Sequence, residues 1–314
     1  PWNKYHNTIW SILSSIDRHP EQERYLIGAL CAIIDAFNFD LVTKPGIGNE
    51  DDVDDEKTAV WRALERRVIP KIEGLLTKEK IERNGTKTKM IRPPVVLALV
   101  KLFQKFPESF FESKLPHVLT VMCDALRNKD SDARDLARTT MSKIVSGMDL
   151  KYLADVVREL AITLNEGYKL HVRSAVIHSI LQELESTHSP SQLTSEVKSH
   201  TSNFDSAIPA IMDILQEDLF GEANERRESR ETNVRYVKEA GGSKSVNSVE
   251  IICRLLTFKP SDASGSISKS SIHCVVGPLL ERLRMPDINA ATIRKIKEIL
   301  LRVVIGLSHN PSVG

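Results

Sequence analysis

The stretch that decides the fold runs Lys114-Leu-Pro-His-Val-Leu-Thr-Val-Met-Cys-Asp-Ala-Leu126. Its apolar residues recur at every third or fourth position, which places them on one face of a helix: Leu115, Val118, Leu119, Met122, Ala125 and Leu126. The polar residues at 128–132 predict a turn, because Asn, Asp and Ser side chains accept hydrogen bonds from backbone N–H groups and cap the next helix. We therefore expect a second helix from Ala133 to about Gly147.

The same two-helix unit follows directly downstream. A first helix is predicted over 150–164, a turn at 165–167 and a second helix over 172–184. Arg134 and Arg173 lie 39 residues apart, each near the start of a second helix. Two helices in a period of this length are typical of HEAT or armadillo repeats, so the sequence predicts an all-α fold, an α-solenoid of helical pairs.

One turn of the first copy carries a more specific pattern. The segment Asp130-Ser-Asp-Ala-Arg134-Asp-Leu-Ala137 resembles the HEAT-family motif, in which an Asp and an Arg link the turns of adjacent repeats. The resemblance implies such ladder contacts for Asp130, Arg134 and Arg173, although the second copy lacks the Asp. Ala137 is expected in the core, where a small side chain lets two helices approach.

The rest of the chain continues the helical pattern. We expect a single solenoid over 1–314, of about six helical pairs, as a fragment of a longer protein. Prolines at 70, 116, 209 and 278 lie inside apolar helices and are expected to kink them. Three segments interrupt the pattern: an acidic loop at 42–56, a Ser/Thr-rich insertion at 188–204 and a loop at 259–270. No segment has a strand period long enough to build a sheet, so none is expected.

Composition excludes several classes of protein. The formal net charge of +1 gives the whole chain no attraction to nucleic acid or anionic lipid, so such attraction must be local. The longest apolar run, Val95 to Val100, is far shorter than the roughly 20 residues of a membrane helix. The four cysteines are far apart and without metal-ligand spacing, as expected of buried thiols in a reducing compartment.

No motif of catalysis or cofactor binding is complete. Gly241-Gly-Ser-Lys244-Ser245 lacks the Gly that a phosphate loop needs directly before the Lys. His171 and His178 have no third metal ligand and are interpreted as partly exposed structural histidines. The acidic residues at 51–55 lack the Gly and Glu of a calcium loop. We therefore predict no enzyme, no catalytic residue, no cofactor and no metal site.

Two basic stretches are the remaining candidates for function. The first, proposed as an RNA or protein contact, contains Lys78, Lys80, Arg83, Lys87, Lys89 and Arg92. The second contains Arg282, Arg284, Arg294, Lys295, Lys297 and Arg302. No aromatic residue for base stacking lies near either, so contact with RNA would be to its backbone and shape. The alternative is that both are solvated faces.

The order of several segments is specific. They resemble, in this order, a stretch of the DRIM family of giant HEAT-repeat proteins associated with the U3 small nucleolar RNA: 35–41, 94–103, 113–116, 133–138, 165–168, 218–221 and 243–245. Among them are Asp35-Ala-Phe-Asn-Phe-Asp-Leu41, Asn165-Glu-Gly-Tyr168 and Asp218-Leu-Phe-Gly221. The resemblance spans residues 30 to 260 and is strongest from Pro94 to Tyr168.

The resemblance implies a non-catalytic scaffold of the small-subunit processome in the nucleolus, needed to process the small-subunit ribosomal RNA precursor. It implies other processome proteins, pre-ribosomal RNA and small nucleolar RNA as partners, with no membrane and no small-molecule substrate. Two alternatives stay open. A nuclear transport receptor or phosphatase scaffold would have more regular repeats and an acidic concave face. The helical scaffold of a very large kinase would be recognised from the full-length sequence.

Overall fold

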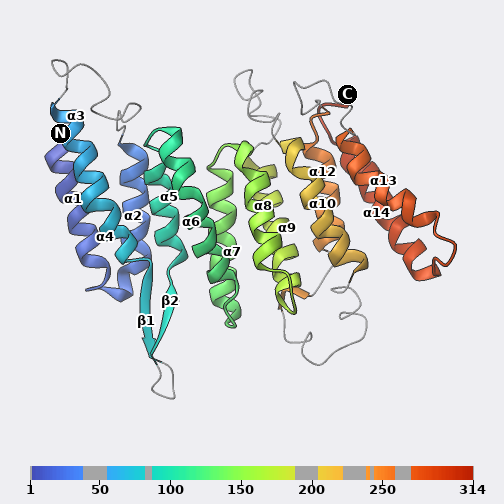
Figure 1. Cartoon of the computed structure of the whole chain (residues 1–314), viewed down its shortest axis with the longest axis horizontal. Coiled ribbons are helices and arrows are strands. Elements are labelled where there is room, and N and C mark those ends of the chain that lie inside the picture. The colour runs from blue at the N-terminus through green and yellow to red at the C-terminus, as the bar shows by residue number, and fades with distance from the viewer. Residues whose placement is uncertain are drawn as a thin grey trace. The chain divides into compact units, whose positions relative to one another are not determined.

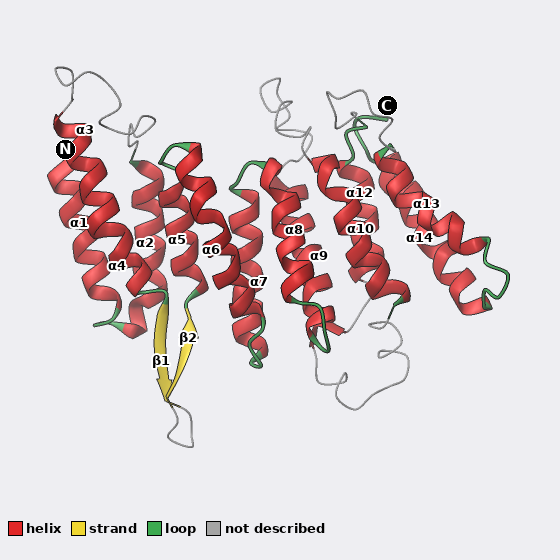
Figure 2. Cartoon of the chain, in the orientation of Figure 1, coloured by secondary structure: helices red, strands yellow, loops and turns green. Residues whose placement is uncertain are grey.

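The chain consists mainly of helices. The computed structural model describes residues 2–37, 55–81, 87–187, 204–221, 238–240, 244–258 and 270–313. Within these ranges the helices are accompanied by a β-hairpin (Figures 1 and 2). The chain divides into two compact units, Pro1–Ala125 and Leu126–Gly314. The predicted all-α, solenoid-like fold is confirmed. That residues 1–314 form one single solenoid stays a prediction.

The first unit is a set of helices packed through apolar stripes. They are α1 (Trp2–Ile16), α2 (Glu23–Ala36), α3 (Asp55–Ala63), α4 (Ile69–Gly74), α5 (Pro93–Phe103) and α6 (Glu108–Leu126). Helix α2 contacts both α1 and α5, and α4 also contacts α5. The predicted acidic loop at 42–56 lies outside the described residues, except that its last two residues belong to α3.

A widened turn precedes Pro70, where a kink was predicted. Residues Leu64–Val68 form a π-helical turn, and the N–H of Ile69 donates to the carbonyl of Leu64, five residues earlier. Proline has no N–H and its ring collides with the carbonyl four residues back, so a wider turn accommodates it. The other three prolines lie inside α6, α10 (Phe204–Phe220) and α13 (Ser271–Leu283), as predicted.

The expectation of no sheet is wrong for the first basic stretch. Strands β1 (Thr77–Ile81) and β2 (Lys87–Ile91) form an antiparallel pair, which Figure 1 shows extending past the ends of the neighbouring helices. Both strands are short and rich in charged residues, so their sequences carry little of the apolar alternation that identifies a strand. A two-stranded antiparallel pair also needs only a short connection, because its strands are close together in the sequence.

The second unit stacks helices in two rows. One row consists of α7 (Ser131–Ser146), α9 (Lys169–Thr187), α12 (Lys244–Leu255) and α14 (Ala290–Ser308), each in contact with the next. The other consists of α8 (Leu153–Thr163), α10 and α13. Successive pairs therefore place one helix in each row, as helical repeats do (Figure 1).

The core of this unit follows the predicted stripes. Ala137 is fully buried in α7, as expected. At Gly306, in α14, an added Cβ would lie 2.6 Å from the Cβ of Cys253 and closer still to the carbonyl oxygen of Glu250. Glycine thus permits the close approach of α14 to α12.

The predicted insertion at 188–204 and loop at 259–270 lie outside the described residues, apart from Phe204 and Ser270. Among the helices that are described, none is long and apolar enough to cross a membrane.

Candidate interaction surfaces

The hairpin distributes the predicted contact lysines over two faces. Residues opposite one another in the register share a face, so Lys87 and Lys89 lie with Glu79 on one side. Their side chains are exposed, and Lys87 Nζ lies 3.0 Å from a carboxylate oxygen of Glu79. Lys78 occupies a register position on the other side. Strand alternation therefore prevents these cations from forming a single basic surface.

Two of the predicted contacts are engaged within the first unit. Arg92 is only 7% exposed. Its guanidinium lies 2.9 Å from a carboxylate oxygen of Asp17 and 3.4 Å from one of Glu23. Lys78 also reaches Glu23, at 3.0 Å. These ion pairs fix the base of the hairpin against the turn between α1 and α2. Arg83 lies outside the described residues.

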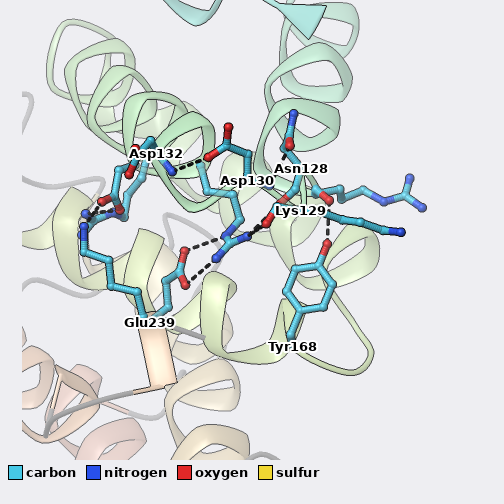
Figure 3. A network of polar contacts seen from close by, with 11 residues as sticks. Asn128, Lys129, Asp130, Asp132, Tyr168 and Glu239 are labelled. Atoms are coloured by element: carbon cyan, nitrogen blue, oxygen red, sulfur yellow. Dashed lines mark hydrogen bonds and ion pairs between the residues drawn. The ribbon is translucent and has the colours of Figure 1, made fainter. Parts of the chain in front are cut away.

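The turn before α7 is built as the capping pattern predicted (Figure 3). Asp130 is the N-cap of α7, and its carboxylate accepts a hydrogen bond from the N–H of Asp132 at 3.0 Å. The side chain of Asn128 in turn accepts from the N–H of Asp130 at 2.9 Å. The hydroxyl of Tyr168 donates to the carbonyl of Arg127 at 2.6 Å, which joins this turn to the next one.

Arg134 lies at the centre of this network. Its Nη1 donates to the carbonyls of Asn128 and Lys129, both at 2.9 Å. Its Nε and Nη2 donate to the two carboxylate oxygens of Glu239 at 2.7 and 2.9 Å. Its guanidinium carbon lies 5.5 Å from the ring centroid of Tyr168. The ladder role of Arg134 stays a prediction. In this structure Arg134 joins its own turn to Glu239 and Tyr168, and the carboxylate comes from Glu239 rather than from the Asp of a neighbouring turn.

Electrostatics hold the Arg134–Glu239 pair in its charged form. The hydrogen bonds that Arg134 donates to Glu239, and the negative charge of Glu239, raise the pKa of Arg134. Burial is the largest single effect on Glu239 and opposes its ionisation, but the hydrogen bonds from Arg134, a backbone hydrogen bond and the charge of Arg134 together outweigh it, so the pKa of Glu239 lies below its ordinary value. Beside this pair, Lys238 bonds Asp135. Sequence reasoning missed Glu239, because it lies 105 residues from Arg134 in a charged segment without an apolar stripe.

Arg173 occupies the equivalent place in the next repeat with different partners. It is buried, and its Nη1 lies 3.4 Å from the carbonyl oxygen of Ala161. Burial lowers the pKa of Arg173, and the carboxylates of Glu217 and Asp218 partly offset this effect. The structure therefore gives Arg134 and Arg173 separate networks.

The interpretation of the two histidines as partly exposed is wrong. His171 is 1% and His178 is 9% exposed, because α9 is surrounded by helices of both rows. His178 Nδ1 lies 3.0 Å from the hydroxyl of Ser248, and His171 Nδ1 lies 3.6 Å from a carboxylate oxygen of Asp218.

Asp218 also accepts a hydrogen bond from Ser245, at 2.5 Å. The carboxylate thus stands between the hydroxyl of Ser245 and the imidazole of His171. Catalytic triads instead place the imidazole between hydroxyl and carboxylate, so that it can accept the proton of the hydroxyl.

The second basic stretch surrounds an aromatic ring, contrary to expectation. The guanidinium of Arg282 lies 4.5 Å from the centroid of Phe220, and Lys295 Nζ lies 5.9 Å from it. Lys295 also donates to the carbonyl of Leu219 at 3.0 Å. Arg302 bonds Glu250 at 2.8 Å. Half of this stretch therefore joins α13 and α14 to α10 and α12.

Metal ligands do not converge in the part of the chain that the structure describes. Burial raises the pKa of the Cys253 thiol to about 12, which keeps it protonated and unreactive at neutral pH.

Comparison with known proteins places the chain in a family. Residues 82–314 match the model described as the U3 small nucleolar RNA-associated protein 20 domain. The chain belongs to this family. The resemblance of its ordered segments to the DRIM family is thereby confirmed.

Two relatives carry the name of this family. The U3 small nucleolar RNA-associated protein 20 of Saccharomyces cerevisiae is 31% identical over 219 residues, which is 70% of this chain. The protein of the same name from Schizosaccharomyces pombe is 26% identical over 223 residues, or 71% of this chain. The chain spans 8% of the length of each relative.

Proposed function

We propose that this chain is part of a non-catalytic scaffold in ribosome biogenesis. The full-length protein would be a component of the small-subunit processome, in the nucleolus, required to process the precursor of small-subunit ribosomal RNA. Its partners would be other processome proteins, pre-ribosomal RNA and small nucleolar RNA.

The family match over residues 82–314 carries this proposal. Both relatives are named for association with the U3 small nucleolar RNA. The fold agrees with a scaffold, because stacked helical repeats offer long surfaces to several partners at once. The candidate contacts in this chain are the exposed hairpin lysines, Lys87 and Lys89, and the ladder residues Asp130, Arg134 and Arg173 keep a structural role in the proposal.

Depletion of the full-length protein tests the proposal. Cells that lack it should accumulate uncleaved precursor of the small-subunit ribosomal RNA, measured by hybridisation, while the large-subunit RNA continues to mature. A tagged protein should be nucleolar and should co-purify the U3 RNA. Re-expression of the intact protein is the control, since it should restore cleavage. Normal precursor levels after depletion would refute the processing role.

A further inference from the structure

The hairpin is a two-stranded sheet, so among the described residues each of its strands has one edge without a neighbouring strand. At the base of the hairpin, the N–H of Arg92 donates to the carbonyl of Leu76 at 2.7 Å. The adjacent residue of each strand, Thr77 in β1 and Ile91 in β2, forms the next cross-strand pair. Bonded and non-bonded pairs alternate along an antiparallel ladder. Thr77 and Ile91 therefore form a non-bonded pair, and their backbone groups point out of the hairpin.

The same alternation gives β2 an open outer edge. The N–H and C=O groups of Lys87, Lys89 and Ile91 point away from β1, whereas those of Thr88 and Met90 point toward it. Each of the three outward residues can exchange two hydrogen bonds with an added strand. Lys87 and Lys89 are exposed, so the edge is accessible in the unit to which it belongs.

Charge distinguishes the two edges of the hairpin. Lys87 and Lys89 flank the outer edge of β2, on one face. Glu79 stands on the same face of β1, directly opposite Lys89 and 3.0 Å from Lys87. On this face, an acidic strand added to β2 would meet the two lysines first, and one added to β1 would meet the carboxylate of Glu79. Lys78 lies on the other face of β1, where its ammonium pairs with Glu23.

We propose that the outer edge of β2, residues 87–91, binds an extended acidic segment of a partner protein by strand addition. Main-chain hydrogen bonds provide the attachment, and the lysines select negative side chains. The inference rests on the proposed function, in which the partner is another protein of the assembly. RNA is the weaker occupant, because the register places Lys78 on the opposite face from Lys87 and Lys89 and sets the carboxylate of Glu79 beside these two lysines.

A pair of substitutions separates the main chain from the charge. Lys89→Pro removes the charge and the outward N–H but keeps the ladder to β1, since an edge strand accepts proline where its N–H faces solvent. Lys89→Ala removes the same charge and keeps the N–H, so it is the matched control. Both are tested in the 314-residue chain with a labelled synthetic peptide of alternating Glu and Val, followed by fluorescence anisotropy.

We expect the Pro variant to bind the peptide about fivefold more weakly than the Ala variant, as for one lost main-chain hydrogen bond. Equal loss in both variants, or no binding of the peptide to the parent chain, overturns the proposal. A U-rich RNA oligonucleotide that binds tightly and displaces the peptide also overturns it, in favour of a phosphate site.

Hydrogen exchange of the unsubstituted chain keeps the test valid if the Pro variant does not fold. Added peptide should protect the amides of Lys87, Lys89 and Ile91 and leave those of Thr88 and Met90, already bonded to β1, unchanged. If the peptide binds but the protection of these amides does not alternate along β2, strand addition is refuted. The proposed function is tested separately by the depletion experiment. Normal processing of the precursor after depletion would refute it, whether or not the peptide binds the chain.

Discussion

Replacement of Gly306 by alanine tests the packing of α14 against α12. The new Cβ would lie 2.6 Å from the Cβ of Cys253, whereas carbon atoms pack best at about 3.5–4.0 Å. The carbonyl of Glu250 is also in its way, and because it is helix backbone it cannot rotate aside. The two helices must therefore separate by roughly 1 Å along their contact.

The cost follows from that displacement. A gap of 0.5–1 Å forfeits about a quarter to a half of the dispersion energy of each contact that it opens. Overpacking typically costs about 1–3 kcal/mol, and the clash with the rigid backbone carbonyl of Glu250 places this variant in the upper part of that range, at about 2–3 kcal/mol. The better helix propensity of alanine offsets about 1 kcal/mol. We therefore expect a net loss of about 1–2 kcal/mol in the free energy of unfolding, and a fall in Tm of about 2–8 °C.

Thermal and urea unfolding, followed by far-UV circular dichroism, measure the change. Gly28→Ala is the control: Gly28 lies in α2, and an added Cβ there meets nothing within 4 Å, so this variant should gain up to about 1 kcal/mol. If Gly306→Ala is as stable as the parent chain, the close approach of α14 to α12 is incorrect.

Three further predictions concern buried groups. Arg134→Met leaves Glu239 buried without its cation and should lower the free energy of unfolding, measured with urea, by about 3–5 kcal/mol. Adding Glu239→Met should restore part of this loss, and strictly additive losses in the double variant would refute the coupling of the two residues. Burial, then the charges of Lys244 and Arg138, lowers the pKa of His178, so the unfolded chain takes up the proton first and stability should fall as pH drops below about 6.5. His178→Asn should flatten the Tm profile between about pH 7 and 5, and an unchanged profile would contradict the pKa direction. The thiol of Cys253 should react with a thiol reagent only after unfolding, and rapid labelling at neutral pH would show that it is accessible.

Local sequence patterns determined the helices and their order. The apolar stripe of 115–126 gives one face to α6, and the side chain of Asp130 caps α7 through an N–H two residues away. Both effects act within a few residues, so they can be recognised without knowing the rest of the fold. The positions of the four prolines in helices were predictable for the same reason.

The tertiary structure decided which distant residues meet. Arg134 finds its carboxylate 105 residues away, and Phe220 receives cations from two later helices. Burial of His171 and His178 likewise depends on how many helices surround α9, which its own sequence does not encode.

The basic stretch shows the difference most clearly. Its sequence indicates six cations in fifteen residues. It does not indicate the strand pairing that places Lys78 on one face and Lys87 and Lys89 on the other, nor the burial of Arg92. Composition is a property of the chain, whereas the face on which a charge lies depends on the register of two strands and on the helices beneath them. The sequence by itself therefore determined the helical repeats, and only the tertiary structure decided which charges remain available to a partner.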